Sequence, residues 1–283
     1  MVGRRRRPCH RHHPHRDRHV PAEGVPQVVS VYVKRGTSRQ IAFEAAGLQD
    51  LRACGARVAE LAQVDDTSLA TVTIQETSPT QQAAYEFGTM LAGLHENGSD
   101  RVFGQAPPGF DLAEHGEGTM GQERLPLVSA GAQPRPWGVF YAEDRILPYL
   151  GSAVSNGSID TDGAQVIEAL AELLRDGAFD TDDRPSVLHG DLWSGNVLWS
   201  ADGGVLIDPA SHAGHRESDL AQLTVFGAPH WDDITAGYES VKELSEGWNE
   251  RIGLHQLHIL IVHASLFGGS YGRQTVRTAQ NYL

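Results

Sequence analysis

The chain has 283 residues, of which 40% are hydrophobic, and its formal net charge is −13 at pH 7. A chain of this size can bury a sizeable core in one bilobal unit, and no apolar run approaches the ~18 residues of a membrane span. The negative charge argues against a nucleic-acid-binding body. The two cysteines, Cys9 and Cys54, cannot form a disulfide framework, so a reducing cytoplasm is the expected location.

Residues 1–24 differ in composition from the rest of the chain. The first twenty residues contain seven arginines and five histidines against a single aspartate. Such a segment cannot bury apolar surface, so we expect it to be disordered, and it lacks the apolar centre of a secretory signal. It could be an arm that seeks phosphate or nucleic acid, or a metal-capturing histidine cluster. We favour a non-native leader, from a misassigned start or a disrupted upstream frame.

Residues 25–78 predict a small nucleotide-binding lobe. Valines at 29, 31 and 33 alternate with polar residues, as in a half-buried strand that ends at Lys34. The following helix has an apolar face, and Glu44 lies on that face. Because a buried carboxylate needs a cation, Lys34 is its expected partner. Residues 69–76 predict the last strand of this lobe, which leads into a hinge at Glu76 whose backbone would meet the edge of an adenine.

Residues 79–283 predict a larger and mainly helical lobe. Three apolar stripes at helical spacing, within residues 83–94, 166–174 and 254–264, are interpreted as core. Residues 103–136 are rich in glycine and proline and show little periodicity. We therefore expect a long loop there that is either functional or poorly ordered.

The stretch from His189 to Asn196, with Asp208 twelve residues later, carries the clearest chemistry. Two apolar segments, 197–199 and 205–207, predict a hairpin with residues 201–204 as its turn. The spacing of Asp191 and Asn196 equals that of the protein-kinase catalytic loop. An aspartate there can accept the proton of an attacking hydroxyl, while an asparagine and a second aspartate hold magnesium against the phosphates. The alternative is a simple turn at residues 189–191, with Asn196 as a cap on a strand end.

The segments HGDLWSGN (189–196), IDPA (207–210) and GHRESDLA (214–221) together resemble the fructosamine kinase, or ketosamine-3-kinase, family. That family has the aminoglycoside-phosphotransferase-like, protein-kinase-like fold. The resemblance implies an α+β, bilobal protein with a small β-rich N-lobe and a larger, mainly helical C-lobe. Family members normally begin with a strand, a glycine-bearing turn and a second strand over the phosphates. Nothing similar precedes Val28, so the N-lobe is expected to be truncated.

The resemblance also assigns roles to single residues. It implies ATP and Mg²⁺ as cofactors, with Asp191 as the base and Asn196 and Asp208 as the magnesium ligands. Lys34 would bind the phosphates, held in place by Glu44. Trp193 would border the acceptor sugar. A further set would bind substrate or brace the loop: His215, Arg216 and Glu217.

The implied partner is a small-molecule or protein-bound ketosamine, that is, a sugar rearranged onto an amine. Two alternatives stay open at this point. One is an aminoglycoside or choline kinase of the same fold. The other is a catalytically silent family member whose function is limited to binding. We interpret His189 as structural support and Asp219 as a brace. The sequence does not indicate an oligomeric state.

Overall fold

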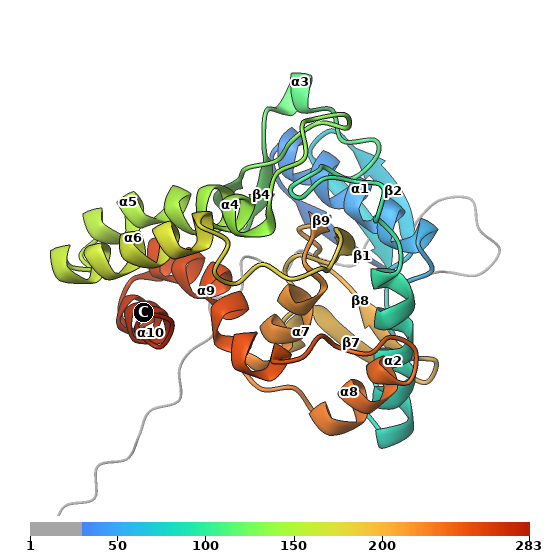
Figure 1. Ribbon diagram of the computed structural model, residues 1–283. Helices are drawn as coiled ribbons and strands as arrows, with labels where there is room; N and C mark the ends of the chain where they lie inside the picture. Colours follow the sequence, from blue (N-terminus) through green and yellow to red (C-terminus); the bar gives the residue numbers. More distant parts are fainter. Residues whose placement is uncertain (1–29) are drawn as a thin grey trace, which may run out of the picture.

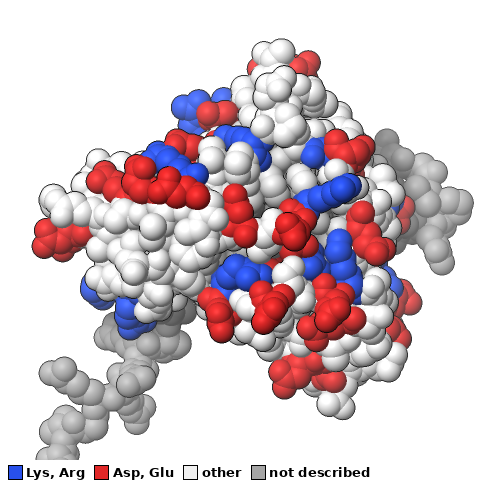
Figure 2. All heavy atoms as spheres, in the orientation of Figure 1, with Lys and Arg blue, Asp and Glu red and all other residues white. Residues whose placement is uncertain are grey.

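The computed structural model describes residues 30–283 (Figure 1). The basic segment 1–24 and the start of the expected first strand lie outside the described residues, so the interpretation of the leader stays a prediction. Figure 2 shows acidic and basic side chains interspersed over one face, with no continuous basic area on that face. Among residues 30–283, no helix is long and apolar enough to cross a membrane.

The smaller lobe is an antiparallel sheet with one helix packed against it. Its strands are β1 (Val31–Arg35), β2 (Leu61–Asp65) and β3 (Ser68–Val72), in the order β1-β3-β2. Helix α1 (Ser38–Ala53) begins with a capping box between Thr37 and Gln40, which satisfies two backbone N–H groups that the helix leaves unpaired. The last strand of this lobe, predicted over residues 69–76, is shorter in the structure. Strand β3 ends at Val72, and residues 73–80 form an irregular connection to the larger lobe.

The larger lobe is mainly helical, as the apolar stripes predict. The longest helix of residues 30–283, α9 (Trp248–Phe267), packs against α5 (Leu147–Ser155), α7 (Arg216–Thr224) and α10 (Ser270–Gln280). Helix α2 (Gln81–His95) packs against α8 (Trp231–Glu239), and α6 (Thr161–Arg175) packs against α10. A short helix, α4 (Trp137–Phe140), and a π-helical turn, η1 (Tyr141–Ile146), lead into α5. Figure 1 shows α5, α6, α9 and α10 grouped on one side of this lobe.

The prediction of a long irregular loop over residues 103–136 is wrong in part. This segment contains the short helix α3 (Leu112–His115) and a hairpin of β4 (Gly118–Met120) and β5 (Glu123–Leu125). Met120 and Leu125 are buried, and the Gln40 side chain of α1 donates a hydrogen bond to the Gly121 carbonyl. The hairpin is therefore ordered against α1. Strands of three residues are too short to show an alternating pattern in the sequence.

Two small two-stranded sheets in the larger lobe position the candidate site. Strand β6 (Ser186–Leu188) pairs with β9 (His212–Gly214), and β7 (Val197–Ser200) pairs with β8 (Gly203–Leu206). The hairpin expected after Asn196 is present, but its turn contains only residues 201 and 202. Gly204 lies inside β8, where a Cβ atom would approach the Phe87 ring to 2.7 Å. Glycine is thus needed for close packing at this position, although the sequence suggests a turn residue.

Candidate active site

The loop between β6 and β7 presents Asp191 beside Asn196. The Asn196 side-chain amide donates to the Asp191 backbone carbonyl at 2.8 Å and to its carboxylate Oδ2 at 3.1 Å. This arrangement leaves the Asn196 amide oxygen to act as a ligand atom. Burial raises the pKa of Asp191 to about 7, opposed by the Asn196 hydrogen bond and reinforced by the nearby Asp208 charge. A carboxyl group that titrates near neutral pH is suited to accept a proton in a reaction.

Lys34 connects the two lobes through a pair of carboxylates. Its Nζ atom lies 2.5 Å from Glu44 Oε2 and 3.1 Å from Asp208 Oδ1. Burial by itself would lower the pKa of Lys34, but the Glu44 and Asp208 charges outweigh burial and raise that pKa above its usual value. The Lys34–Glu44 contact predicted from the sequence is confirmed. A lysine held in this way presents a fixed positive charge beside Asp208.

Asp208 follows β8 in a backbone conformation that is unusual for a non-glycine residue. Its φ is +53°, in the left-handed region, and its side chain is 46% exposed. Residues held in such conformations cost free energy and cluster at functional sites. The strained backbone therefore presents the Asp208 carboxylate toward solvent at the point where Lys34 meets it.

The donor atoms at this site suit magnesium. Mg²⁺ prefers oxygen ligands and binds through one or two protein carboxylates together with substrate phosphates. The Asn196 amide oxygen and the Asp208 carboxylate provide such ligands. The Asp208 carboxylate is 46% exposed and, among the described residues, meets a single cation, Lys34, at 3.1 Å, so it stays accessible to a metal ion. Asn196 and Asp208 would thus hold the metal, while Asp191 would stay free for the proton.

A buried aspartate on α7 fixes the backbone of the loop. Asp219 accepts hydrogen bonds from the His189 amide at 2.7 Å and from the Gly190 amide at 2.9 Å. The His95 Nε2 atom also lies 3.2 Å from this carboxylate. On the other side, His189 Nε2 donates to the Ile207 carbonyl at 2.9 Å, one residue before Asp208. Asp219 and His189 thus make the supporting contacts expected of them, and they tie the two carboxylate-bearing segments together.

The GHRE segment makes its contacts inside the protein. Arg216 donates to Asp183 at 2.9 Å, and Glu217 pairs with Arg251 at 2.6 Å, both from buried positions. The His215 ring lies 3.0 Å from the Thr181 hydroxyl. These are the contacts of a brace at the start of α7. The substrate role of His215, Arg216 and Glu217 stays a prediction.

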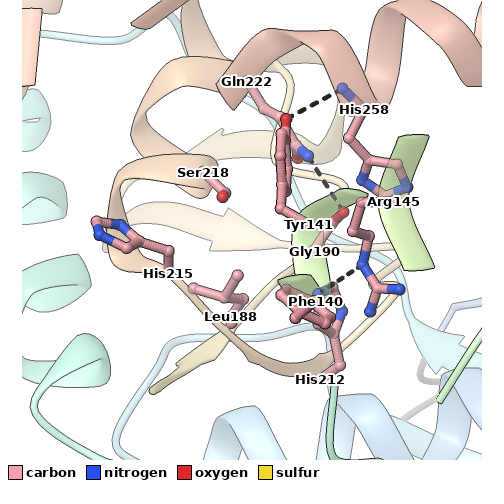
Figure 3. A pocket seen from close by; sticks show the side chains of 11 residues that line it. Phe140, Tyr141, Arg145, Leu188, Gly190, His212, His215, Ser218, Gln222 and His258 are labelled. Carbon is pink, nitrogen blue, oxygen red and sulfur yellow. Dashed lines mark hydrogen bonds between the residues drawn. The ribbon is translucent and has the colours of Figure 1, made fainter. Parts of the chain in front are cut away.

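A small polar cavity lies behind the loop (Figure 3). Gly190 borders it, together with Arg145, His212, His258 and Gln222. The volume open to a water centre is about 10 Å³, which is room for a single water molecule. Gln222 accepts a hydrogen bond from the Leu192 amide at 2.8 Å, so the cavity wall also supports the loop. The sequence assigns no role to the Gln222 or His95 side chain, because their contacts with the loop depend on how α7 and α2 pack against it.

The remaining predicted site residues are Trp193 and Glu76. Trp193 is half-buried, and its indole lies directly against Gly195, where a Cβ atom would approach the ring to 2.0 Å. Glu76 lies in the irregular connection between the lobes, next to Thr77, whose amide donates to the Trp199 carbonyl of β7 at 2.7 Å. Their roles toward an acceptor sugar and an adenine stay predictions.

A three-stranded N-lobe with a lysine–glutamate pair, joined to a helical lobe with an Asp–Asn–Asp site, defines the protein-kinase-like fold. An ADP-bound aminoglycoside phosphotransferase, APH(2'')-Ib, has the same fold with a TM-score of 0.58, covering 94% of each chain at 14% identity. The chain belongs to the fructosamine kinase family, whose model matches residues 27–283. The family predicted from the sequence is thus confirmed, and so is the fold.

Individual relatives agree with this family. A crystal structure of a "putative fructosamine-3-kinase" from Thermobifida fusca superposes with a TM-score of 0.82 at 38% identity, covering 96% of this chain and 91% of that one. A "Probable ketoamine kinase" from Klebsiella aerogenes is 38% identical over 71% of this chain, and one from Vibrio parahaemolyticus is 32% identical over 71%. The chain spans 62% and 63% of the lengths of these two relatives.

Proposed function

We propose that the protein is an ATP-dependent kinase that phosphorylates a sugar hydroxyl of a ketosamine. The observation that carries this proposal is a pair of contacts: Asn196 holds the Asp191 carboxylate, and the Asp208 carboxylate meets Lys34, a lysine that is already paired with Glu44. Phosphoryl transfer requires a proton acceptor, oxygen ligands for magnesium and a cation on the phosphates, held in fixed positions. Membership of the fructosamine kinase family supports a ketosamine as the acceptor.

In the proposed reaction, the acceptor hydroxyl donates a hydrogen bond to the Asp191 carboxylate. As the hydroxyl oxygen forms its bond to the γ-phosphorus, its proton passes to Asp191, and the bond from that phosphorus to the β–γ bridging oxygen breaks to release ADP. Lys34 would bind the α- and β-phosphates. Asn196 and Asp208 would hold Mg²⁺, which neutralises triphosphate charge when bound. Most of the catalysis would come from positioning and electrostatics rather than from covalent chemistry.

Three further assignments belong to this proposal. The Glu76 segment would contact the adenine, and Trp193 would contact the acceptor sugar. The protein would be located in the cytoplasm, where ATP is available and a chain with few cysteines is expected. Acceptor ketosamines could be free small molecules or attached to proteins, in which case phosphorylation would begin their deglycation.

A panel of acceptors tests the proposed function. The full chain is incubated with ATP and Mg²⁺, and ADP release is measured for fructosyl-lysine and ribulosyl-lysine against kanamycin, choline and glucose. The same panel with Asp191→Asn controls for contaminating kinases. We expect a ketosamine to give the highest kcat/KM. A higher value for choline or kanamycin would overturn the ketosamine assignment, and no transfer to any acceptor would indicate a silent family member.

A further inference from the structure

Aromatic side chains form a continuous row that leads away from the catalytic loop. The Trp193 ring meets Phe226 edge-on at a centroid distance of 5.6 Å, and Phe226 lies 5.6 Å from His263. His263 in turn lies 5.4 Å from Phe267 and 5.0 Å from Tyr271. We call these five residues the aromatic row. It begins two residues after Asp191 and ends where α9 gives way to α10.

The outer part of the row is exposed to solvent. Phe226 is 45% exposed and Phe267 is 67% exposed, and in the described part of the chain no other phenylalanine is exposed. Phe267 is the last residue of α9, and Gly268 and Gly269 follow it with positive φ. The helix therefore ends so that the ring stands at the surface. A contiguous exposed apolar patch that adjoins a site is typical of a ligand-binding surface.

The row carries no positive charge of its own. His263 Nδ1 donates to the Ile259 carbonyl at 2.7 Å, and burial lowers the pKa of this histidine, which favours the neutral form of the ring. A ketosamine contains a secondary amine that is protonated at this pH. Aromatic ring faces attract such cations, and a neutral histidine does not repel them.

We propose that the aromatic row binds the amine substituent of the acceptor, and that the protein prefers ketosamines whose amine carries an alkyl or aromatic group. This inference rests on the proposed ketosamine kinase activity. The sugar would lie at Trp193 beside Asp191, while the ammonium and its substituent extend outward over Phe226 and Phe267. The row begins at Trp193, the residue proposed to contact the sugar. The part of the acceptor that reaches the rest of the row is therefore the group attached to the sugar, which is the amine and its substituent.

Two acceptors with the same sugar test this inference. One is N-methyl-fructosamine, whose substituent is too short to extend beyond Trp193, and the other is N-benzyl-fructosamine, whose ring extends to Phe226, the next ring of the row at 5.6 Å. We expect the benzyl compound to have a KM about tenfold lower, the scale for burial of two methylene groups. Phe226→Ala should remove most of that difference and leave the KM of the methyl compound within about twofold.

Several controls separate the possible outcomes. Tyr85 on α2 is also exposed, at 39%, and Tyr85→Ala should leave both KM values unchanged. Trp193→Ala should raise both KM values, because the sugar is common to the two acceptors. Calorimetric binding of the same two compounds measures the preference without turnover. The inference is wrong, while the proposed function stands, if wild type binds and phosphorylates the two compounds equally. The same holds if the double variant Phe226→Ala, Phe267→Ala keeps the preference for the benzyl compound. Absence of turnover together with a retained, Phe226-dependent binding preference would instead refute the proposed function.

Discussion

Replacing Asp219 by asparagine should both destabilise the protein and impair the catalytic loop. The Asp219 carboxylate is fully buried and accepts the His189 and Gly190 amides at 2.7 and 2.9 Å. An asparagine of the same shape has one oxygen and one NH₂ group, so one of the two amides loses its acceptor and faces another donor. A lost hydrogen bond to a charged group costs about 1.5–3 kcal/mol, and an unsatisfied buried donor adds to that.

We therefore expect Asp219→Asn to lower the free energy of unfolding by about 3 kcal/mol. For a protein of this size the corresponding fall in Tm is roughly 6–12 °C, which a thermal-shift assay resolves. Asp50→Asn provides a matched control, because Asp50 is also buried but accepts two hydrogen bonds from Arg101, at 2.6 and 2.7 Å. Both variants should lose stability. When turnover is measured at a temperature where both variants are folded, only Asp219→Asn should show a lower kcat. An unchanged Tm and kcat in Asp219→Asn would refute the bracing role.

Three further predictions concern the site itself. Asn196→Ala and Asp208→Ala should each weaken the Mg²⁺ dependence of nucleotide binding, measured by titration with and without the metal; equal dependence in both variants and wild type would exclude them as ligands. Trp193→Ala should raise the acceptor KM and leave the ATP KM within about threefold, since the lost contact is to one substrate only; a matching rise in both would place Trp193 elsewhere. Because burial raises the pKa of Asp191 to about 7, kcat/KM of the free enzyme should fall as pH drops through 7 and the base becomes protonated; a pH profile flat from 6 to 8 would contradict this.

The same titration has a consequence for stability. A carboxyl group whose pKa is raised by folding favours the folded state at low pH, and that contribution is lost as pH rises through the folded-state pKa. Asp191→Asn has no such loss. The Tm of Asp191→Asn minus the Tm of wild type should therefore increase as pH rises from 5 to 8. A difference that stays constant over this range would show that Asp191 is not desolvated in the absence of ligand.

Local patterns in the sequence predict much of the fold because they report burial directly. The helical stripe that contains Phe87 and Leu91 is buried in α2, and Glu44 is buried on the apolar face of α1, where it meets Lys34 as expected. In each case the spacing of apolar residues determines which face packs, and a charged residue on that face requires a partner. The spacing of Asp191 and Asn196 predicts that both lie in one loop, and the structure adds that the Asn196 amide donates to the Asp191 carboxylate.

The sequence was less informative where structure depends on tertiary contacts. The β4–β5 hairpin has strands of three residues and is held by α1 through Gln40, a contact that no local pattern records. Gly204 has the composition of a turn, yet it lies in a strand because Phe87 leaves no room for a side chain. Gln222, which supports Leu192, and the exposed ring of Phe267 likewise acquire their roles only when α7 and α9 pack beside the catalytic loop.

The central claim is that Asp191 accepts the proton in phosphoryl transfer. The most direct test is to measure both turnover and nucleotide binding on one preparation of Asp191→Asn. Asn196 can still bind through its amide oxygen and Lys34 keeps Glu44, so the Kd for ATP and Mg²⁺ should stay within about threefold of wild type, while kcat for the best ketosamine should fall about 10²-fold or more. A kcat within a few-fold of wild type, with nucleotide binding intact, would show that another group accepts the proton.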